Sequence, residues 1–125
     1  MIDPYAFVTR AYAAFNERRL DDALALLDPE VEWPNGMEGG TVYGHAGVRD
    51  YWTRQWTLID PHVEPRRTTI GADGRVYVDV HQVVRDLHGT VLVDQMVQHV
   101  YTLKAGRAER MEIRAANPES AAPAI

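Results

Sequence analysis

The residue with the clearest capacity for acid–base chemistry is His99. Residues 90–104 predict a β-strand, and the alternation of side chains along it would place His99 on one face with Val97 and Tyr101. An imidazole can accept or donate a proton near neutral pH, and apolar surroundings would lower its pKa and leave a neutral base. We therefore predict His99 as the catalytic candidate, with Val97 and Tyr101 beside it in a pocket wall. A hydrogen-bonded core histidine is the alternative.

Aromatic side chains suited to binding an apolar molecule gather in the first half of the chain. All three tryptophans, Trp33, Trp52 and Trp56, fall within 24 residues, and the sequence Pro-Asn-Gly follows the first of them. Such a cluster is typical of a pocket wall and equally of a hydrophobic core and the residues that cover it. We expect the three indoles to line a pocket, together with Tyr12, which would bring a hydroxyl group from the first helix.

The composition excludes several other kinds of site. The chain has no cysteine, and its five histidines show no His-x-His or His-x3-His spacing, so we expect no metal and no cofactor. A net charge of −5 with scattered basic residues argues against a nucleic-acid partner. No apolar run approaches the roughly 20 residues that span a bilayer. The opening residues lack the basic start and apolar centre of a signal peptide. A cytoplasmic location is therefore expected.

The elements that would position these residues are helices first and strands afterwards. Apolar spacing and capping signals predict helices at about residues 3–19, 20–28 and 45–59. A short strand is expected at residues 31–33, and alternating Val, Thr, Tyr and Ile predict strands at 62–70, 75–87, 90–104 and 108–115. Short turns make the later strands antiparallel. The expected fold class is α+β, as one domain over residues 1–116 with a frayed tail at 117–125.

Alternation also sorts the side chains of the strand at residues 75–87. Its more apolar face carries Gln82, which we predict to point into the pocket, whereas His81 lies on the opposite face. The turn at His88-Gly89 is either a two-residue turn or a bulged loop, and the two forms give different registers. The sequence leaves open which of His81 and His99 faces the pocket.

Three stretches in this order resemble one family. They are RAYAAFNERRLDDALALLDPEVEWPNG, HAGVRDYW and HVYTLKAGRAERMEI. Over about residues 5–114 the chain is similar to SnoaL-like members of the nuclear transport factor 2 superfamily, which includes ketosteroid isomerases, polyketide cyclases and limonene epoxide hydrolases. The resemblance implies a cone-shaped fold in which three N-terminal helices pack on a strongly curved, mostly antiparallel sheet. It also implies an apolar pocket at the open end of the cone.

The catalytic residues of two branches of this superfamily are not retained. Trp33 stands where ketosteroid isomerases carry the Asp base, and indole has no useful basicity. Ala11 takes the place of their oxyanion-binding Tyr, with Tyr12 adjacent but rotated by about 100° on a helix. Their second oxyanion donor, an Asp, falls on His99. The Arg-x-Asp pair of the epoxide hydrolases occurs only at Arg19-Leu20-Asp21, between helices.

The resemblance implies a small-molecule pocket protein that binds an apolar or aromatic ligand. It could catalyse proton transfer, dehydration or cyclisation, as an isomerase, cyclase or lyase. Two alternatives stay open: a non-catalytic ligand-binding module, and a dimerisation or protein-interaction domain with a vestigial cavity. We also expect a homodimer through the outer face of the sheet, on the premise that Val and Tyr make that face apolar.

Overall fold

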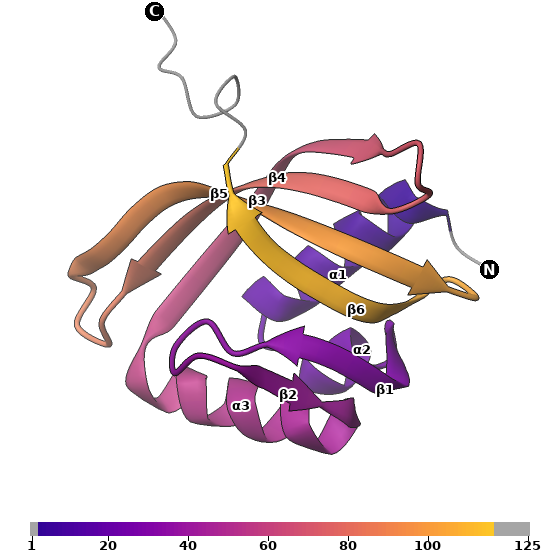
Figure 1. Cartoon of the computed structure of the whole chain (residues 1–125). Coiled ribbons are helices and arrows are strands. Elements are labelled where there is room, and N and C mark those ends of the chain that lie inside the picture. Colours follow the sequence, from indigo (N-terminus) through magenta and orange to yellow (C-terminus); the bar gives the residue numbers. More distant parts are fainter. Residues whose placement is uncertain (1–2, 117–125) are drawn as a thin grey trace, which may run out of the picture.

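The chain folds as three helices against one face of a strongly curved sheet of six strands (Figure 1). The computed structural model describes residues 3–116, so the tail predicted at residues 117–125 lies outside the described part. The helices are α1 (Pro4–Asn16), α2 (Leu20–Leu24) and α3 (Gly44–Leu58). The strands are β1 (Leu27–Pro34), β2 (Thr41–Tyr43), β3 (Asp60–Ile70), β4 (Val76–Arg85), β5 (Val91–Lys104) and β6 (Arg107–Ala115). The predicted α+β class is confirmed. Within residues 3–116 no helix has both the length and the apolar character needed to cross a membrane.

Helix α1 begins at a side-chain cap and presents one apolar stripe to the sheet. The Asp3 carboxylate accepts a hydrogen bond from the Ala6 backbone N–H at 2.9 Å. The stripe buries Phe7, Val8 and Tyr12. The helix ends at Asn16, earlier than the predicted residue 19, because Arg18 adopts a positive φ of 60° that helical geometry excludes. The Arg18 guanidinium then donates to the Pro61 carbonyl at 2.9 Å, which ties the end of α1 to the start of β3.

The segment after α2 differs most from the sequence-based expectation. The predicted helix at 20–28 stops at Leu24, and the strand predicted at 31–33 already begins at Leu27. Leu27 pairs with Ala108 of β6, and the Ala108 N–H donates to the Leu26 carbonyl at 3.0 Å. This parallel pairing joins segments that lie about 80 residues apart, so local spacing carries no sign of it.

Strand β2, which the sequence analysis did not predict, forms a hairpin with β1. Its three residues pair antiparallel with the end of β1, where Trp33 lies opposite Val42. Helix α3 follows at once from Gly44, which has a φ of 71°. A Cβ at this glycine would lie 3.1 Å from the Pro29 carbonyl oxygen, so the tight step from β2 into α3 depends on a residue without a side chain.

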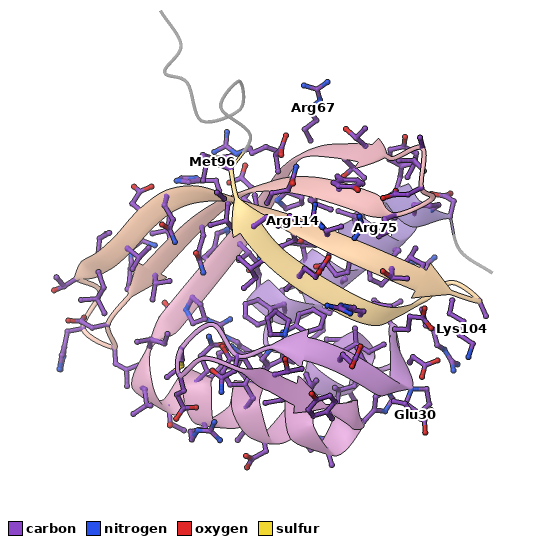
Figure 2. All side chains as sticks on the ribbon, in the orientation of Figure 1. Glu30, Arg67, Arg75, Met96, Lys104 and Arg114 are labelled. Carbon is purple, nitrogen blue, oxygen red and sulfur yellow. The ribbon has the colours of Figure 1, made fainter. Side chains whose placement is uncertain are left out.

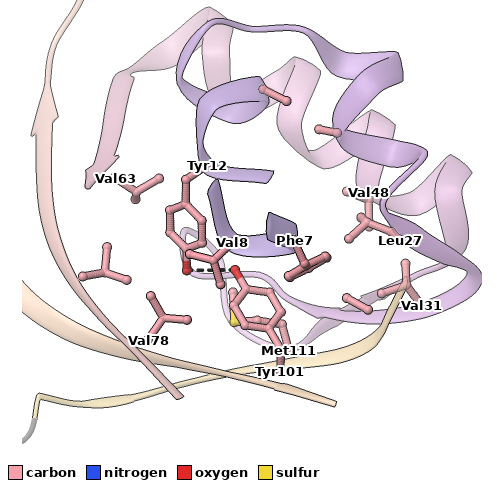
Figure 3. Close-up of a cluster of buried hydrophobic side chains, with 14 of the residues drawn as sticks. Phe7, Val8, Tyr12, Leu27, Val31, Val48, Val63, Val78, Tyr101 and Met111 are labelled. Carbon is pink, nitrogen blue, oxygen red and sulfur yellow. Dashed lines mark hydrogen bonds between the residues drawn. The ribbon is translucent and has the colours of Figure 1, made fainter. Parts of the chain in front are cut away.

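The sheet has the strand order β2-β1-β6-β5-β4-β3. Among the described strands only β1 and β6 pair in parallel, so the sheet is mostly antiparallel, as predicted. Register shifts interrupt β3 at Pro65/Arg67, β4 at Val84/Arg85 and β5 at Thr102/Leu103. Such bulges increase local twist and bending. The result is a sheet that curls around the helices, with the buried side chains on its concave side (Figure 3).

The observed register settles which histidine faces the helices. His99 lies opposite Val78, and His81 lies opposite Met96. His99 therefore shares the concave face with the buried Val78, whereas His81 lies on the outer face and contacts the Asp94 carboxylate at 2.7 Å. The connection is a loop closed by a hydrogen bond of 2.8 Å from the Asp86 N–H to the Thr90 carbonyl.

The outer face of the sheet is more polar than the sequence analysis expected. Arg75 and Arg114 both contact the carboxylate of Glu112, at 3.1 Å and 3.2 Å. Figure 2 shows Arg67, Arg75 and Arg114 on the side of the sheet away from the helices. The premise of an apolar outer face was therefore wrong. The reason is that charged residues from β3 and β6 interleave with the Val and Tyr residues of β4 and β5.

Candidate functional site

A cavity of about 520 Å³ lies between the concave face of the sheet and the helices. This volume falls within the range of ordinary small-molecule sites. Its lining is mostly aliphatic and aromatic, and none of the described lining residues is Asp, Glu, Lys or Arg. The polar side chains in the lining are Tyr12, Tyr51, Gln55, Gln82, Gln95, His99 and Tyr101.

Three of these polar side chains form one buried hydrogen-bonded chain. The Tyr101 hydroxyl donates to the Tyr12 hydroxyl at 2.9 Å, and Tyr12 Oη lies 2.7 Å from His99 Nδ1. All three residues are buried, with exposed fractions between 3% and 7%. Figure 3 shows the contact between the two tyrosines, one from α1 and one from β5. The period of β5 places His99 and Tyr101 on one face, and the apolar stripe of α1 aims Tyr12 at them.

The direction of this chain determines what His99 can offer a ligand. We assign the Tyr101 hydroxyl as the donor to Tyr12, which turns the Tyr12 hydrogen toward His99 Nδ1 as its acceptor. A neutral imidazole whose Nδ1 accepts must carry its proton on Nε2. Burial lowers the pKa of His99 to about 4, so the ring is neutral at pH 7. Nε2 has no hydrogen-bond partner within residues 3–116. With this assignment the nitrogen available to a ligand is an N–H donor, which is the hydrogen-bonding form of the acid–base or hydrogen-bonding role predicted for His99.

The two tyrosines are also uncharged at neutral pH. Burial raises the pKa of Tyr12 well above its ordinary value, and the nearby Tyr101 raises it further. Burial is also the main reason why the pKa of Tyr101 is raised. The three hydrogen-bonded side chains are therefore all uncharged, and their contacts hold the imidazole ring of His99 in a fixed place.

An aromatic wall adjoins this chain. The Trp33 and Trp52 rings meet edge to face with centroids 5.4 Å apart, and Trp33 lies 6.2 Å from Tyr101. Both indoles line the cavity. Trp56 does not line it, although the sequence analysis placed it there. Its ring stacks on Trp52 at 6.0 Å with the Arg18 guanidinium 5.1 Å from its centroid, so it supports the wall from behind.

A second group of polar residues lies on α3, and the sequence analysis left it out of the site. Tyr51 Oη accepts hydrogen bonds from the Gly36 N–H at 3.1 Å and from Gln55 Nε2 at 3.3 Å. The contact with Gly36 fastens the loop between β1 and β2 to α3, whereas the contact with Gln55 lies within the helix. Gln55 Oε1 and Trp56 Nε1 are buried and have no partner within the described residues. Helical spacing marked the buried side of α3 but could not show which of its polar groups reach the cavity.

Two glutamines border the cavity farther along the sheet. Gln82 of β4 lies directly opposite Gln95 of β5, and Gln95 Nε2 donates to Gln82 Oε1 at 3.0 Å. Gln95 is exposed and so is Ile113, another lining residue, so the cavity opens to solvent on this side. The sequence analysis named Gln82 but missed Gln95. The alternation that linked Val97 to His99 would have reached Gln95 two residues earlier.

The family profile of the SnoaL-like domain matches residues 8–111, which is most of the chain. The chain belongs to the SnoaL-like domain family.

Solved structures agree with this assignment. TerC, co-crystallised with polyporic acid, is 32% identical to this SnoaL-like domain over 87% of this chain and 88% of its own, with a TM-score of 0.76. An NTF2-like protein of unknown function from Burkholderia pseudomallei is 28% identical over 95% of each chain, with a TM-score of 0.78. A Mycobacterium tuberculosis protein in complex with estradiol-17beta-hemisuccinate is 14% identical over 87% of this chain and 90% of its own, with a TM-score of 0.74, and shares the fold alone. No curated protein matches the sequence.

The SnoaL-like domain thus brings together most of the residues predicted for its site. Around one cavity lie Tyr12, Trp33, Trp52, Gln82, Val97, His99 and Tyr101. Ala11, at the position of the isomerase tyrosine, also lines it, and the adjacent Tyr12 reaches His99 despite its rotation. Within residues 3–116 no three His, Asp or Glu side chains are grouped as metal ligands. The arrangement offers a mostly apolar cavity with a few hydrogen-bonding groups in its lining.

Proposed function

We propose that this SnoaL-like protein binds a neutral aromatic molecule and that His99 Nε2–H donates a hydrogen bond to a carbonyl oxygen of that molecule. The observation that carries the proposal is the buried Tyr101–Tyr12–His99 chain at the cavity. It holds the imidazole ring in place and, in the assigned direction, keeps the proton on the nitrogen that has no partner among the described residues.

The chemistry of the lining supports a neutral aromatic ligand. A charged group would lose its hydration on entering an apolar cavity and would find no counter-ion among the described lining residues. Trp33 and Trp52 present rings to a flat molecule. The structures of TerC with polyporic acid and of the mycobacterial protein with estradiol-17beta-hemisuccinate show aromatic ligands in proteins of this fold. Both ligands carry an acidic group, so they support the aromatic character of the proposed ligand, and its neutrality rests on the lining alone.

The N–H donor suits reactions in which negative charge develops on the carbonyl oxygen. When a proton leaves the carbon next to a carbonyl, the electron pair moves onto oxygen, and a preorganised donor stabilises that charge. A neutral imidazole can fill this role. No described lining residue is a carboxylate, so we assign the departing proton to water at the open side of the cavity. Keto–enol isomerisation includes such a step, and so do those dehydrations and cyclisations that begin with loss of a proton next to a carbonyl.

The test uses aromatic methyl ketones and measures binding and enolisation separately. Quenching of tryptophan fluorescence reports binding, and exchange of the methyl hydrogens in D₂O, followed by NMR, reports enolisation. We expect a carboxylate analogue of the same size to bind at least about tenfold more weakly than the ketone. His99→Leu should slow exchange by about 10²-fold, and His99→Gln should slow it less because Gln keeps an N–H donor. His81→Gln, on the outer face, is the matched control. Unchanged exchange in His99→Leu would contradict the proposal.

A second candidate is a binding module without catalysis. The absence of a carboxylate from the described lining favours it, because no side chain there is a strong base at pH 7. It predicts the same preference for neutral ligands, with no exchange above the rate in buffer. The exchange measurement therefore separates the two candidates.

We further propose that the protein forms a homodimer through the outer face of its sheet. Arg75, Glu112 and Arg114 make alternating charges on this face, and a two-fold axis can bring each charge against an opposite one on the second copy. Such an interface depends on ion pairs, in contrast to the apolar contact expected from the sequence.

A further inference from the structure

The cavity has polar groups at two separate places along β5, and only one of them is used by the proposed function. His99 marks the first place, and the Gln82–Gln95 pair marks the second. Between them on the same face lies Val97, which lines the cavity and is buried. The sheet thus presents a polar, apolar and polar sequence to whatever occupies the cavity.

The Gln82–Gln95 pair has unused hydrogen-bonding capacity. Their one mutual hydrogen bond uses Gln95 Nε2 and Gln82 Oε1. Gln82 Nε2 and Gln95 Oε1 have no partner within residues 3–116, so the pair offers one donor and one acceptor side by side. Reversing both amides would also leave one donor and one acceptor, so this property does not depend on how the amide atoms are assigned. A hydroxyl group, which both donates and accepts, complements such a pair.

The strand sets the distance between the two places. Gln95 and His99 are four residues apart, and the β4–β5 register is regular from Val76 to Val84. At about 3.3 Å per residue, their backbones lie roughly 13 Å apart. Both side chains point to the concave side, where curvature brings their tips closer together. For a ligand that lies along the strand and hydrogen-bonds sideways to the two places, two linked rings with an oxygen at each end match this span. The two oxygen atoms of a one-ring ligand lie little more than half as far apart.

We propose that Gln82 and Gln95 form a second polar subsite, which binds a hydroxyl group at the far end of a two-ring aromatic ligand whose carbonyl oxygen lies at His99. This inference rests on the proposed function, because it uses the same cavity and the same carbonyl contact. It adds the length of the ligand and the nature of its second polar group. An exposed amide pair selects a neutral hydroxyl group.

The experiment compares two pairs of compounds by tryptophan fluorescence quenching. The two-ring pair is 4-acetylbiphenyl and 4-acetyl-4′-hydroxybiphenyl, and the one-ring pair is acetophenone and 4-hydroxyacetophenone. We expect the hydroxyl group to increase affinity about 3- to 10-fold in the two-ring pair, the size of one or two hydrogen bonds. We expect no increase in the one-ring pair, because its hydroxyl group ends short of the glutamines.

Variants then locate the contact. In Gln82→Leu/Gln95→Leu the ratio of the two-ring affinities should fall to about one. Gln95→Leu alone, at an exposed position that tolerates change, should lower the ratio in part. Gln98→Leu makes the same substitution on the outer face of β5 and should leave the ratio unchanged. A ratio that survives in the double variant, or an equal gain in the one-ring pair, would overturn the subsite while leaving the proposed function intact. Failure of all four compounds to bind would overturn both.

Discussion

His99 shows how one residue type takes its chemistry from its neighbours. In water an imidazole is charged about half the time near pH 6.5. Here the surrounding apolar side chains remove its hydration and lower its pKa, and Tyr12 occupies Nδ1. The ring is therefore neutral, and the assigned hydrogen-bond direction places its proton on Nε2. An equally neutral histidine without Tyr12 could carry its proton on either nitrogen.

The tautomer of His99 provides a direct test of the Tyr12 contact. In ¹⁵N-histidine-labelled protein at pH 7, we expect the chemical shifts of the His99 ring to report the Nε2–H form. Tyr12→Phe removes the hydroxyl group that donates to Nδ1, so both tautomers should then be populated. Tyr77→Phe, which removes a hydroxyl group bonded to Asp73 instead, is the control. A predominant Nδ1–H form in the unmodified protein would contradict the assigned direction of the hydrogen bonds.

The lowered pKa of His99 also predicts how stability changes with pH. The folded-state pKa is about 4, and the ordinary value is 6.5. Between these values the unfolded chain binds a proton that the folded protein does not, so the free energy of unfolding should fall as the pH decreases from about 6.5. The slope from this one residue reaches at most about 1.4 kcal/mol per pH unit. The slope from His99 is half its maximum near pH 6.5 and vanishes well above that pH.

Urea unfolding between about pH 7 and pH 5 measures this effect, because most carboxylates titrate below that range. His99→Gln should show a smaller loss of stability across the range than the unmodified protein. His81→Gln should keep the loss, since it leaves His99 in place. Equal slopes for the unmodified protein and His99→Gln would show that His99 is not the buried neutral group described above.

Strand β1 and helix α3 cooperate to make the aromatic wall. The pairing of β1 with β2 and β6 holds Trp33 at the cavity, and the buried face of α3 brings Trp52 against it. On the other side of the cavity, Asn16 at the end of α1 bonds both backbone groups of Val63, at 2.7 Å and 3.0 Å. This contact satisfies polar groups of β3, which is an edge strand. Both sides of the cavity are therefore fixed by contacts between elements distant in sequence.

The position of Trp33 in the cavity wall predicts that its substitution affects ligand binding more than the stability of the fold. Trp33 is only half-buried and lines the cavity, so Trp33→Ala should weaken the binding of an aromatic probe while the protein stays folded. Truncating a fully buried aromatic residue would cost about 3–5 kcal/mol, and we expect a smaller loss here. Probe titration and thermal unfolding of the same variant make the comparison. A large drop in Tm with unchanged probe affinity would reject the role of Trp33 in the wall.

The molecule as a whole has two unlike sides. The concave side of the sheet is mostly apolar and, in its described part, free of charged side chains around the cavity, whereas the convex side carries ion pairs between neighbouring strands. The concave side is covered by the helices of the same chain. The convex side is the one available for a second copy.

An interface built on ion pairs predicts a dimer that is sensitive to salt. Sedimentation equilibrium at micromolar concentration should give a dimer mass near twice 14.1 kDa at low ionic strength. Raising the ionic strength to about 1 M should shift the equilibrium toward the monomer, because the Debye length falls to about 3 Å. Glu112→Arg, which places a third positive charge beside Arg75 and Arg114, should have the same effect at low salt. A monomer at every ionic strength would contradict the proposed dimer.

Local patterns in the sequence were enough for much of the fold. The cap at Asp3, the apolar stripe of α1 and the alternation along β4 and β5 are set by neighbouring residues, and each predicted its element and its buried face. The same alternation put Gln82, Val97 and Tyr101 on inward faces. These patterns failed where long-range pairing decides the structure. Strand β1 begins at Leu27, earlier than predicted, because Leu27 pairs with Ala108, and the short strand β2 forms by pairing with the end of β1.

The site depended on tertiary structure for a further reason. Types and spacing named His99 and Tyr12 as candidates, but 87 residues separate them, and no local rule shows that their polar atoms lie 2.7 Å apart. Register across the β4–β5 loop decided that His99 and not His81 faces the cavity, because a shift of one residue reverses every side chain of a strand. Packing places Trp56 behind the aromatic wall, outside the cavity lining, and places Gln95 in the lining. Sequence periodicity determines which face a side chain lies on, and only the folded chain determines what it meets there.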